Sequence, residues 1–361
     1  MYSDRLRRAA ELTAAAGLDG LVVTPGPDLR YLVGARSETF ERLTALVVPA
    51  DGALPSIVLP KLELASLHGS AATELGLQIV DWVDGTDPYA LVADALPGPR
   101  TAVADAMPAL HLLPLAARLG TSPVLATPVL RALRMIKDAE EIAALRRAGQ
   151  AIDRVHARMG EWLRAGRTER EVAADIEAAM LAEGHTVAEF IIVGSGPNGA
   201  DPHHEVSDRV LADGDVVVVD IGGPVAGYNS DCTRMYSIGA PNPDVAEPYS
   251  VLLAAQEAGV AAVRPGVTAA SVDAAARDVL AAAGLAEAFV HRTGHGIGLS
   301  VHEEPYLVAG NDLVLEPGMA FSVEPGIYFP GRWGARIEDI VVVTADGCER
   351  LNTIDRQLRR L

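Results

Sequence analysis

The sequence predicts a mixed α/β (α+β) protein with an N-terminal domain of residues 1–129 and a larger C-terminal domain of residues 130–361. Three observations support this fold class. Helix-like segments rich in Ala and Leu alternate with short β-rich runs before residue 128, a turn-rich stretch follows, and a sequence repeat then divides the remaining chain into two halves. The length of 361 residues allows two or three domains, and a hydrophobic content of 49% is ample for their cores.

Five short β-rich runs mark the N-terminal domain. They cover residues 21–24, 46–49, 57–59, 78–80 and 101–103, and the segments between them have helical periodicity. The domain contains two histidines, His68 and His111, and no cluster of potential metal ligands. We therefore expect it to position, dimerise or gate the second domain. Residues 121–128, which begin Thr-Ser-Pro and end in Pro, are typical of a linker.

A long helix is expected at the start of the C-terminal domain. Asp138 and Glu141 have the spacing of a capping box, in which each side chain accepts a hydrogen bond from the other residue's backbone. Apolar residues at positions 142, 145, 148, 152 and 155 then recur with the period of one helical face.

An internal repeat follows at a constant offset of one hundred residues. Each copy predicts a helix that ends at a glycine and is followed by a β-rich, histidine-containing stretch, residues 190–220 in the first copy and 289–324 in the second. We expect two similar halves that face each other with polar residues between them. The repeated residues are Gly166, Thr168, Val172, Ala174 and Gly184, which recur as Gly266, Thr268, Val272, Ala274 and Gly284.

The composition excludes several classes of partner. A formal net charge of -18 argues against a nucleic-acid groove or an anionic membrane surface. The N-terminal segment lacks the apolar core of a signal peptide, and no later stretch has the length of a membrane span. Two cysteines, Cys232 and Cys348, make no disulfide framework and are expected to be buried thiols in a reducing cytosol. We expect a cytoplasmic protein without nucleic-acid or membrane partners.

Two carboxylates lie in one predicted hairpin, residues 215–236. A run of four valines leads into Asp220, a predicted turn follows at residues 222–224 (Gly-Gly-Pro), and a second extended segment carries Asp231. The two side chains would face each other across the hairpin. Burial of an ionised carboxylate such as Asp220 is costly unless the group is paired, protonated or bound to a metal.

Further polar residues fall in short, glycine-flanked motifs. His203 and His204 lie in a turn-rich loop, and the segment HRTGHGIGLSVHEEP contains three more histidines. Glu324 ends a short predicted strand, and Glu338 interrupts another apolar run. Each of these residues alone is more typical of a turn, a solvated strand face or a structural histidine than of a metal site. Together, four carboxylates with one imidazole suit Mn²⁺, Co²⁺ or Zn²⁺. The carboxylates would repel one another strongly unless about two divalent ions were bound.

Five motifs together resemble the metal-ligand motifs of the pita-bread metallopeptidases, which comprise methionine aminopeptidase, aminopeptidase P and prolidase. They are VVDIG with Asp220, NSDCTR with Asp231, GHGIG with His295, VEPGIY with Glu324 and RIED with Glu338. The N-terminal third resembles the N-terminal domain of the creatinase/prolidase branch, most clearly in RYLVGA at residues 30–35. The resemblance implies a pita-bread catalytic domain with pseudo-twofold symmetry, which agrees with the repeat.

The resemblance also implies a role for each site residue. Asp220 would chelate one divalent ion, His295 and Glu324 would bind the other, and Asp231 and Glu338 would bridge the two. Glu324 would also relay a proton. Of the remaining residues, His302 would polarise the scissile carbonyl, His203 and His291 would hold substrate and stabilise the tetrahedral intermediate, and Arg336 and Tyr328 would line the substrate site.

The additional N-terminal domain resembles the branch that hydrolyses Xaa-Pro bonds, so the implied partners are short peptides with proline at the second position. Prolidases carry an arginine shortly after the second histidine to hold the dipeptide carboxylate, whereas HEEP is here followed by Tyr306. This departure leaves room for aminopeptidase P activity on longer peptides, although Arg332 could substitute. The family also implies a homodimer.

Two alternatives remain at this point. One is a creatinase-like amidinohydrolase, and the other is a metal-free pita-bread module that binds peptides without cleaving them. The complete set of five ligand residues favours the dinuclear Xaa-Pro aminopeptidase or dipeptidase over both. Mn²⁺ is the first choice of metal, and Co²⁺ and Zn²⁺ share these ligands.

Overall fold

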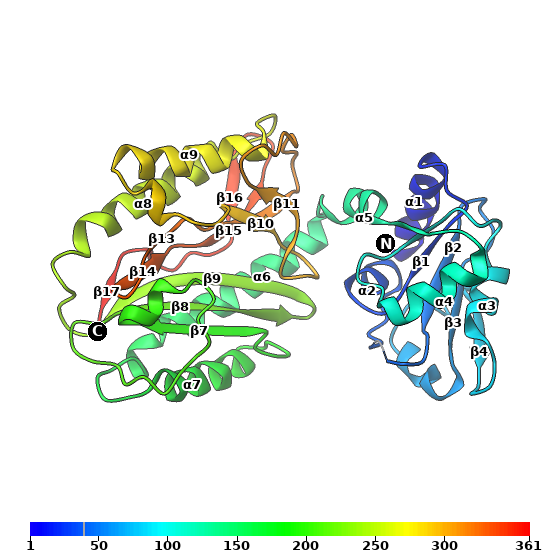
Figure 1. The fold of residues 1–361 in the computed structure, drawn as a ribbon, viewed down its shortest axis with the longest axis horizontal. Coiled ribbons are helices and arrows are strands. Elements are labelled where there is room, and N and C mark those ends of the chain that lie inside the picture. Colours follow the sequence, from blue (N-terminus) through cyan, green and yellow to red (C-terminus); the bar gives the residue numbers. More distant parts are fainter. Residues whose placement is uncertain (39) are drawn as a thin grey trace. The chain divides into compact units, whose positions relative to one another are not determined.

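The computed structural model describes residues 1–38 and 40–361. The chain forms two compact units, Met1–Arg134 and Met135–Leu361. Both units mix helices with sheets (Figure 1). Among the described residues, no helix is both long and apolar enough to cross a membrane.

The first unit is built around a six-stranded sheet in the order β4-β3-β2-β1-β5-β6. The central strand β1 pairs antiparallel with β2 and parallel with β5. The five predicted β-rich runs are confirmed as β1 to β5. The strands are β1 (Gly20–Val23), β2 (Ala45–Pro49), β3 (Ser56–Pro60), β4 (Gln78–Trp82), β5 (Thr101–Val103) and β6 (Val124–Leu125). The helices are α1 (Tyr2–Ala15), α2 (Pro27–Val33), the 3-10 helix η1 (Lys61–Leu67), α3 (Pro88–Asp94), α4 (Ala109–Leu119) and α5 (Thr127–Arg134).

The predicted linker at residues 121–128 is wrong, because this stretch contains a strand of the first unit's sheet and the start of a helix. Val124 and Leu125 form β6, which pairs parallel with Ala102 and Val103 of β5. Helix α5 begins at Thr127, and Pro128 falls in its first turn, where the missing N–H removes no intrahelical hydrogen bond. The turn-forming residues at 121–123 therefore mark a short connection between α4 and β6 inside the first unit.

The second unit contains three sheets and four long helices. The sheet orders are β17-β9-β8-β7, β11-β10-β12-β15-β16 and β13-β14. The first half comprises α6 (Ala139–Ala157), η2 (Met159–Glu161), α7 (Glu169–Ala182), β7 (Phe190–Ser195), η3 (Gly196–Ala200), β8 (Val216–Val225) and β9 (Tyr228–Ser237). The remainder comprises α8 (Ala246–Ala262), α9 (Ala269–Ala282), η4 (Ala286–Ala288), β10 (Gly294–Gly296), β11 (Glu303–Leu307), β12 (Ala320–Val323), β13 (Gly326–Phe329), β14 (Trp333–Arg336), β15 (Asp339–Val343), β16 (Cys348–Arg350) and β17 (Arg359–Arg360).

The predicted helix starts and the repeat are visible in the structure. Asp138 and Glu141 form a capping box at the start of α6. Thr168 and Thr268 cap α7 and α9 through their side chains, and both helices end fourteen residues later. Each cap also forms an isolated bridge, Thr168 with Val210 and Thr268 with Val314. Figure 1 shows the two halves, with α7 beside the β7–β9 sheet and with α8 and α9 beside the sheet that contains β10 and β15.

The β8–β9 hairpin is confirmed, but its predicted turn is wrong. Gly222, Gly223 and Pro224 lie inside β8, and the reversal occurs at Ala226 and Gly227, whose φ angles are 51° and 100°. Two-residue hairpin loops require positive φ at these positions. A Cβ on Gly222 would collide with the Phe190 ring of β7, so this glycine serves close strand packing rather than chain reversal.

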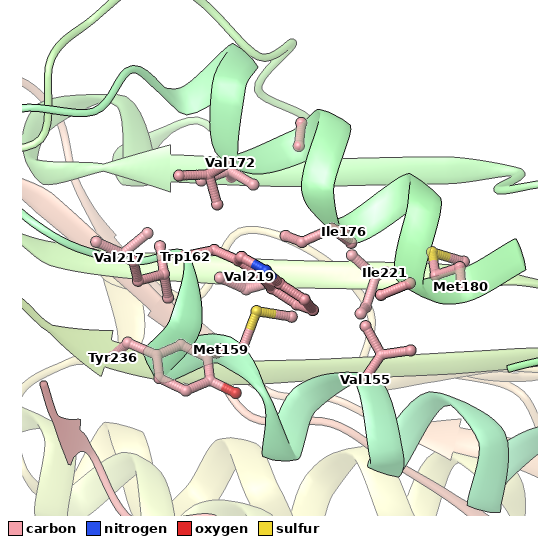
Figure 2. Packing of buried hydrophobic residues seen from close by; sticks show 14 of the residues in the cluster. Val155, Met159, Trp162, Val172, Ile176, Met180, Val217, Val219, Ile221 and Tyr236 are labelled. Carbon is pink, nitrogen blue, oxygen red and sulfur yellow. The ribbon is translucent and has the colours of Figure 1, made fainter. Parts of the chain in front are cut away.

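The two faces of β8 have different environments. Val217, Val219 and Ile221 pack on α6 and α7 in one buried cluster with Val155 and Ile176 (Figure 2). Val216 and Val218 belong instead to a cluster with residues of α8 and of β13 and β14. Because side chains alternate along a strand, Asp220 shares a face with Val218 and points away from α6 and α7.

Candidate active site and metal centre

A cleft of about 920 Å³ lies in the second unit and is lined by residues from both halves. Its walls include all five predicted metal ligands, together with the three further histidines and the arginine that the sequence placed near them. The sequence-predicted residues among its lining are His203, Asp220, Asp231, His291, His295, His302, Glu324, Arg336 and Glu338. Tyr328 lies next to this cleft, in contact with Arg336 and His291.

The first half of the unit supplies Asp220 from β8 and Asp231 from β9. In the antiparallel register, Asp220 is opposite Thr233 and Asp231 is opposite Gly222. The two aspartates are therefore diagonal neighbours on the same face of the hairpin. Both are buried, because the second half covers this face. Their position follows from strand register, which also explains the prediction that they face each other.

The second half supplies His295, Glu324 and Glu338. His295 lies at the centre of β10, Glu324 directly follows β12, and Glu338 directly precedes β15. These three strands are neighbours in one sheet, in the order β10-β12-β15. Adjacent strands therefore bring together three residues that are separated by up to 43 positions in the sequence, from 295 to 338.

The five residues converge on one point. Nε2 of His295 lies 3.2 Å from Oε1 of Glu324 and 3.6 Å from Oδ2 of Asp231. Ligand atoms lie within 4.8 Å of one another in three overlapping groups of three, which suit more than one ion. The groups are Asp231, His295 and His302; His295, Glu324 and Glu338; and Asp220, Asp231 and Glu338.

The electrostatics of this cluster fit bound divalent cations. Oδ1 of Asp220 and Oε1 of Glu338 are buried and have no hydrogen-bond partner among the described residues. Burial, followed by the negative charges of the neighbouring carboxylates, raises the pKa of both Asp231 and Glu338 well above the usual range. Buried carboxylates that repel one another are stabilised when cations bind them. The donor set therefore fits the metal that the sequence predicts.

Side chains around the cluster orient its ligands. Nδ1 of His295 lies 3.0 Å from the carbonyl oxygen of Gly296, so a proton on Nδ1 leaves Nε2 free as a ligand. Oγ of Ser322 accepts a hydrogen bond from the His295 backbone N–H and donates one to Glu324. Oγ1 of Thr233 donates to Oε2 of Glu338 at 2.8 Å. The sequence analysis missed Ser322 and Thr233. Each lies two positions from a ligand in the same strand, and this spacing could have identified them.

Arg336 is engaged on all three of its nitrogen atoms. Nη2 contacts Oδ2 of Asp220 at 2.5 Å, Nη1 donates to the hydroxyl of Tyr328 at 2.7 Å, and Nε donates to Thr233 at 3.1 Å. The Tyr328 hydroxyl also lies 2.9 Å from Nε2 of His291. Burial is the main cause that raises the pKa of Tyr328 to about 12, so its hydroxyl remains protonated. This chain links Asp220 to His291 at the wall of the cleft.

His203 and His302 are exposed to the cleft from two loops. The ring centroids of His302 and His295 are 3.9 Å apart. Burial, followed by the charges of His295 and Arg292, lowers the pKa of His302 to about 4, so the imidazole is neutral at pH 7. His203 follows η3, in a loop held by Glu169 at the N-terminus of α7. The buried carboxylate of Glu169 accepts hydrogen bonds from Ser195, Asn198, His204 and Ser207.

Comparisons with known proteins agree with this site. Residues 143–345 match metallopeptidase family M24, and residues 5–136 match the Creatinase/Prolidase N-terminal domain. "Probable dipeptidase PepE" of Mycobacterium bovis is 68% identical over 361 residues, covering 99% of this chain and 96% of that protein. "Xaa-Pro dipeptidase" of Lactobacillus helveticus is 36% identical over 342 residues, covering 92% of each chain. The crystal structure of dipeptidase PepE from Mycobacterium ulcerans has a TM-score of 0.96 at 67% identity and covers 99% of this chain and 97% of that chain.

These matches confirm the resemblance that the five motifs carry and the expected fold, an N-terminal creatinase/prolidase-type α/β domain followed by a pita-bread domain. The family match covers the residues that form the cleft and its carboxylate cluster. The chain belongs to metallopeptidase family M24, in its creatinase/prolidase branch.

Proposed function

We propose that this metallopeptidase uses two divalent ions to hydrolyse the Xaa-Pro bond of dipeptides. The observation that carries the proposal is the group of four carboxylates and one imidazole that lines the cleft, in which two buried carboxylate oxygens have no hydrogen-bond partner among the described residues. The names of the Mycobacterium and Lactobacillus relatives supply the substrate class.

The five proposed ligands can be divided between two metal ions according to their positions in the cluster. Asp220 and Asp231 would hold one ion, His295 and Glu324 the other, and Asp231 and Glu338 would serve both. When bound, such ions supply Lewis acidity and an activated water for attack on a peptide carbonyl. We propose Mn²⁺ first, and Co²⁺ and Zn²⁺ suit the same oxygen and nitrogen donors.

The protein groups around this centre would position substrate and move protons. Glu324 would accept a proton and return it to the leaving nitrogen, because its carboxylate lies in the proposed metal cluster, 3.2 Å from Nε2 of His295. The neutral imidazole of His302 would donate a hydrogen bond to the carbonyl oxygen as negative charge develops there. His203 and His291 would hold the peptide, and Arg336 with Tyr328 would keep Asp220 and His291 in place.

The charges of the cleft favour an exopeptidase. The free amine of a substrate could donate hydrogen bonds to the carboxylate oxygens of the cluster, whereas an internal peptide bond offers no such group. The Xaa-Pro bond lacks an N–H, so the pocket need not provide an acceptor at that position. Phe190, Ile191 and Ile192 of β7 also line the cleft and supply apolar surface for a proline ring.

The decisive experiment measures release of the N-terminal residue from a Xaa-Pro dipeptide and from a Xaa-Pro-Yaa tripeptide. The protein is first stripped of metal and is then resupplied with Mn²⁺, Co²⁺ or Zn²⁺. We expect hydrolysis of the dipeptide that depends on added metal. A preference for the tripeptide would instead identify aminopeptidase P activity. Failure to cleave either peptide with any of the three metals would refute the Xaa-Pro assignment.

The two alternative functions predict different outcomes. A metal-free peptide-binding module would bind both peptides without cleaving them, and a creatinase-like enzyme would be active after the metal is removed. The expected homodimer and cytoplasmic location stay predictions. Light scattering coupled to size-exclusion chromatography would test the first, and cell fractionation would test the second.

A further inference from the structure

Arg292 is a cation of the cleft that no sequence motif singled out. It directly follows His291 and lines the same cleft as the carboxylate cluster. Its guanidinium carbon lies 4.4 Å from the centroid of the Tyr306 ring, a distance typical of a cation–π contact. Tyr306 occupies β11, directly opposite His295 in the antiparallel register, so the two side chains share one face of the sheet.

The guanidinium of Arg292 forms no ion pair with any residue that the structure describes. Among the residues that the structure describes, its side chain makes no ion pair or hydrogen bond, while its backbone oxygen accepts a hydrogen bond from His291. Arg336, the other arginine of the cleft lining, is committed to Asp220, Tyr328 and Thr233. A half-buried guanidinium without an acidic neighbour is a ready site for a carboxylate, which it binds through two parallel hydrogen bonds.

Arg332, which the sequence analysis offered as a substitute for the missing prolidase arginine, lies elsewhere. Its guanidinium is exposed, forms an ion pair with Asp244 and stacks near the Phe329 ring. It is not part of the cleft lining. Arg332 therefore cannot reach a peptide in the cleft, whereas Arg292 already lies there.

We propose that Arg292, supported by the ring of Tyr306, binds the C-terminal carboxylate of the dipeptide and so selects dipeptides over longer peptides. The inference rests on the proposed function, which it deepens by naming the specificity residue. The ring of Tyr306 in β11 holds the guanidinium of Arg292, which lines the cleft from the segment that precedes β10.

The arrangement also suits the two charges of a dipeptide. Its amino group would face the carboxylate oxygens of the metal cluster, and its carboxylate would face Arg292. An extended dipeptide spans about 7 Å, so both ends can be held within a single cleft. In a tripeptide the group at this position is an uncharged amide, which gains much less from a guanidinium.

The test compares alanyl-proline with alanyl-prolinamide, which differ only in the terminal charge. For the Mn²⁺-loaded Arg292→Leu variant we expect kcat/KM for alanyl-proline to fall about 10- to 100-fold, mainly through KM, with less than about threefold change for the amide. Metal content should equal that of the unsubstituted protein. Arg332→Leu is the matched control and should leave both values unchanged. Equal losses on the two substrates would overturn the proposal.

A rescue experiment separates charge recognition from structural damage. Combining Arg292→Leu with Tyr306→Arg should return most of the preference for the free carboxylate, because the cation is then supplied from β11. A double variant that remains as unselective as Arg292→Leu would count against recognition by a cation at this wall.

Failure of the proposed function can be distinguished from failure of this inference. If the unsubstituted protein cleaves neither substrate, binding is measured by the rise in Tm with free proline and with prolinamide. Stabilisation by proline alone, lost in Arg292→Leu, would support the carboxylate site without any turnover. Equal stabilisation by both compounds, or by neither, would reject it.

Discussion

Replacement of Glu169 by glutamine tests how the loop that carries His203 is held. Oε1 of Glu169 accepts hydrogen bonds from the backbone and hydroxyl of Ser195, and Oε2 accepts them from the backbone and hydroxyl of Ser207. Glutamine replaces one of these acceptors by an NH₂ group, which then faces backbone N–H donors. At least one buried donor therefore loses its partner.

The expected loss can be worked from the ionisation of Glu169. Burial opposes its charge, but hydrogen bonds from Ser195, Ser207 and His204 lower its pKa from 4.5 to about 2. Since the side chain is fully buried, this difference corresponds to about 3 kcal/mol of folding free energy. We expect Glu169→Gln to lower the free energy of unfolding by about 2 to 3 kcal/mol at pH 7. It should also lower kcat/KM by about tenfold or more, because the loop shifts His203 at the wall of the cleft.

The assay is urea denaturation followed by circular dichroism, with Glu177→Gln as the control. Glu177 lies on the exposed side of the same helix, α7. The pKa of Glu169 is lower in the folded than in the unfolded protein, so its stabilisation is complete above pH 4.5 and is lost as the pH falls toward 2. The difference between the two variants should shrink over that range. Equal stability of Glu169→Gln and Glu177→Gln at pH 7 would refute the reasoning.

Four further outcomes are expected. Glu338→Gln should lose metal and at least about 100-fold in activity, so full activity with normal metal content by mass spectrometry would remove Glu338 from the centre. His302→Ala should slow turnover while metal content stays nearly intact, and unchanged kcat would contradict its role at the carbonyl. Thr233→Val should weaken metal affinity about 10- to 100-fold in competition with a chelator, since Glu338 loses its hydrogen bond. Burial lowers the pKa of His156 from 6.5 to about 3, so unfolding takes up a proton below pH 6.5. The free energy of unfolding should therefore fall by up to about 1.4 kcal/mol per pH unit toward pH 3. This pH dependence should be weaker in His156→Gln.

The sequence predicted the elements around the site better than their connections. The β-branched run before Asp220 is a local pattern, and it was predicted correctly as a strand. The predicted turn at residues 222–224 was wrong because glycine occurs both at chain reversals and where strands pack closely. Here Gly222 packs against the Phe190 ring of the neighbouring strand, a contact that the local sequence does not reveal. The linker prediction failed for a related reason, since β6 exists only through its pairing with β5.

Recognition of the site itself depended on motif order, whereas its supporting contacts depend on tertiary structure. Thr233 reaches Glu338 across 105 positions, and Arg336 reaches Asp220 across 116. No local pattern specifies such pairs, because they arise from the docking of one sheet on another. Arg292 was not singled out for the same reason, because its contact with the ring of Tyr306 in β11 is a tertiary contact.

The distribution of ligands explains why the two halves of the second unit must act together. Asp220 and Asp231 come from the β8–β9 hairpin, whereas His295, Glu324 and Glu338 come from the sheet of the other half. The second half alone brings His295, Glu324 and Glu338 together, but each of the other two ligand groups also needs Asp231 from the first half. In the metal-free protein the buried carboxylates repel one another, and divalent ions would remove that repulsion only when both halves are docked. Metal binding should therefore stabilise the interface between the halves as well as prepare the site for catalysis.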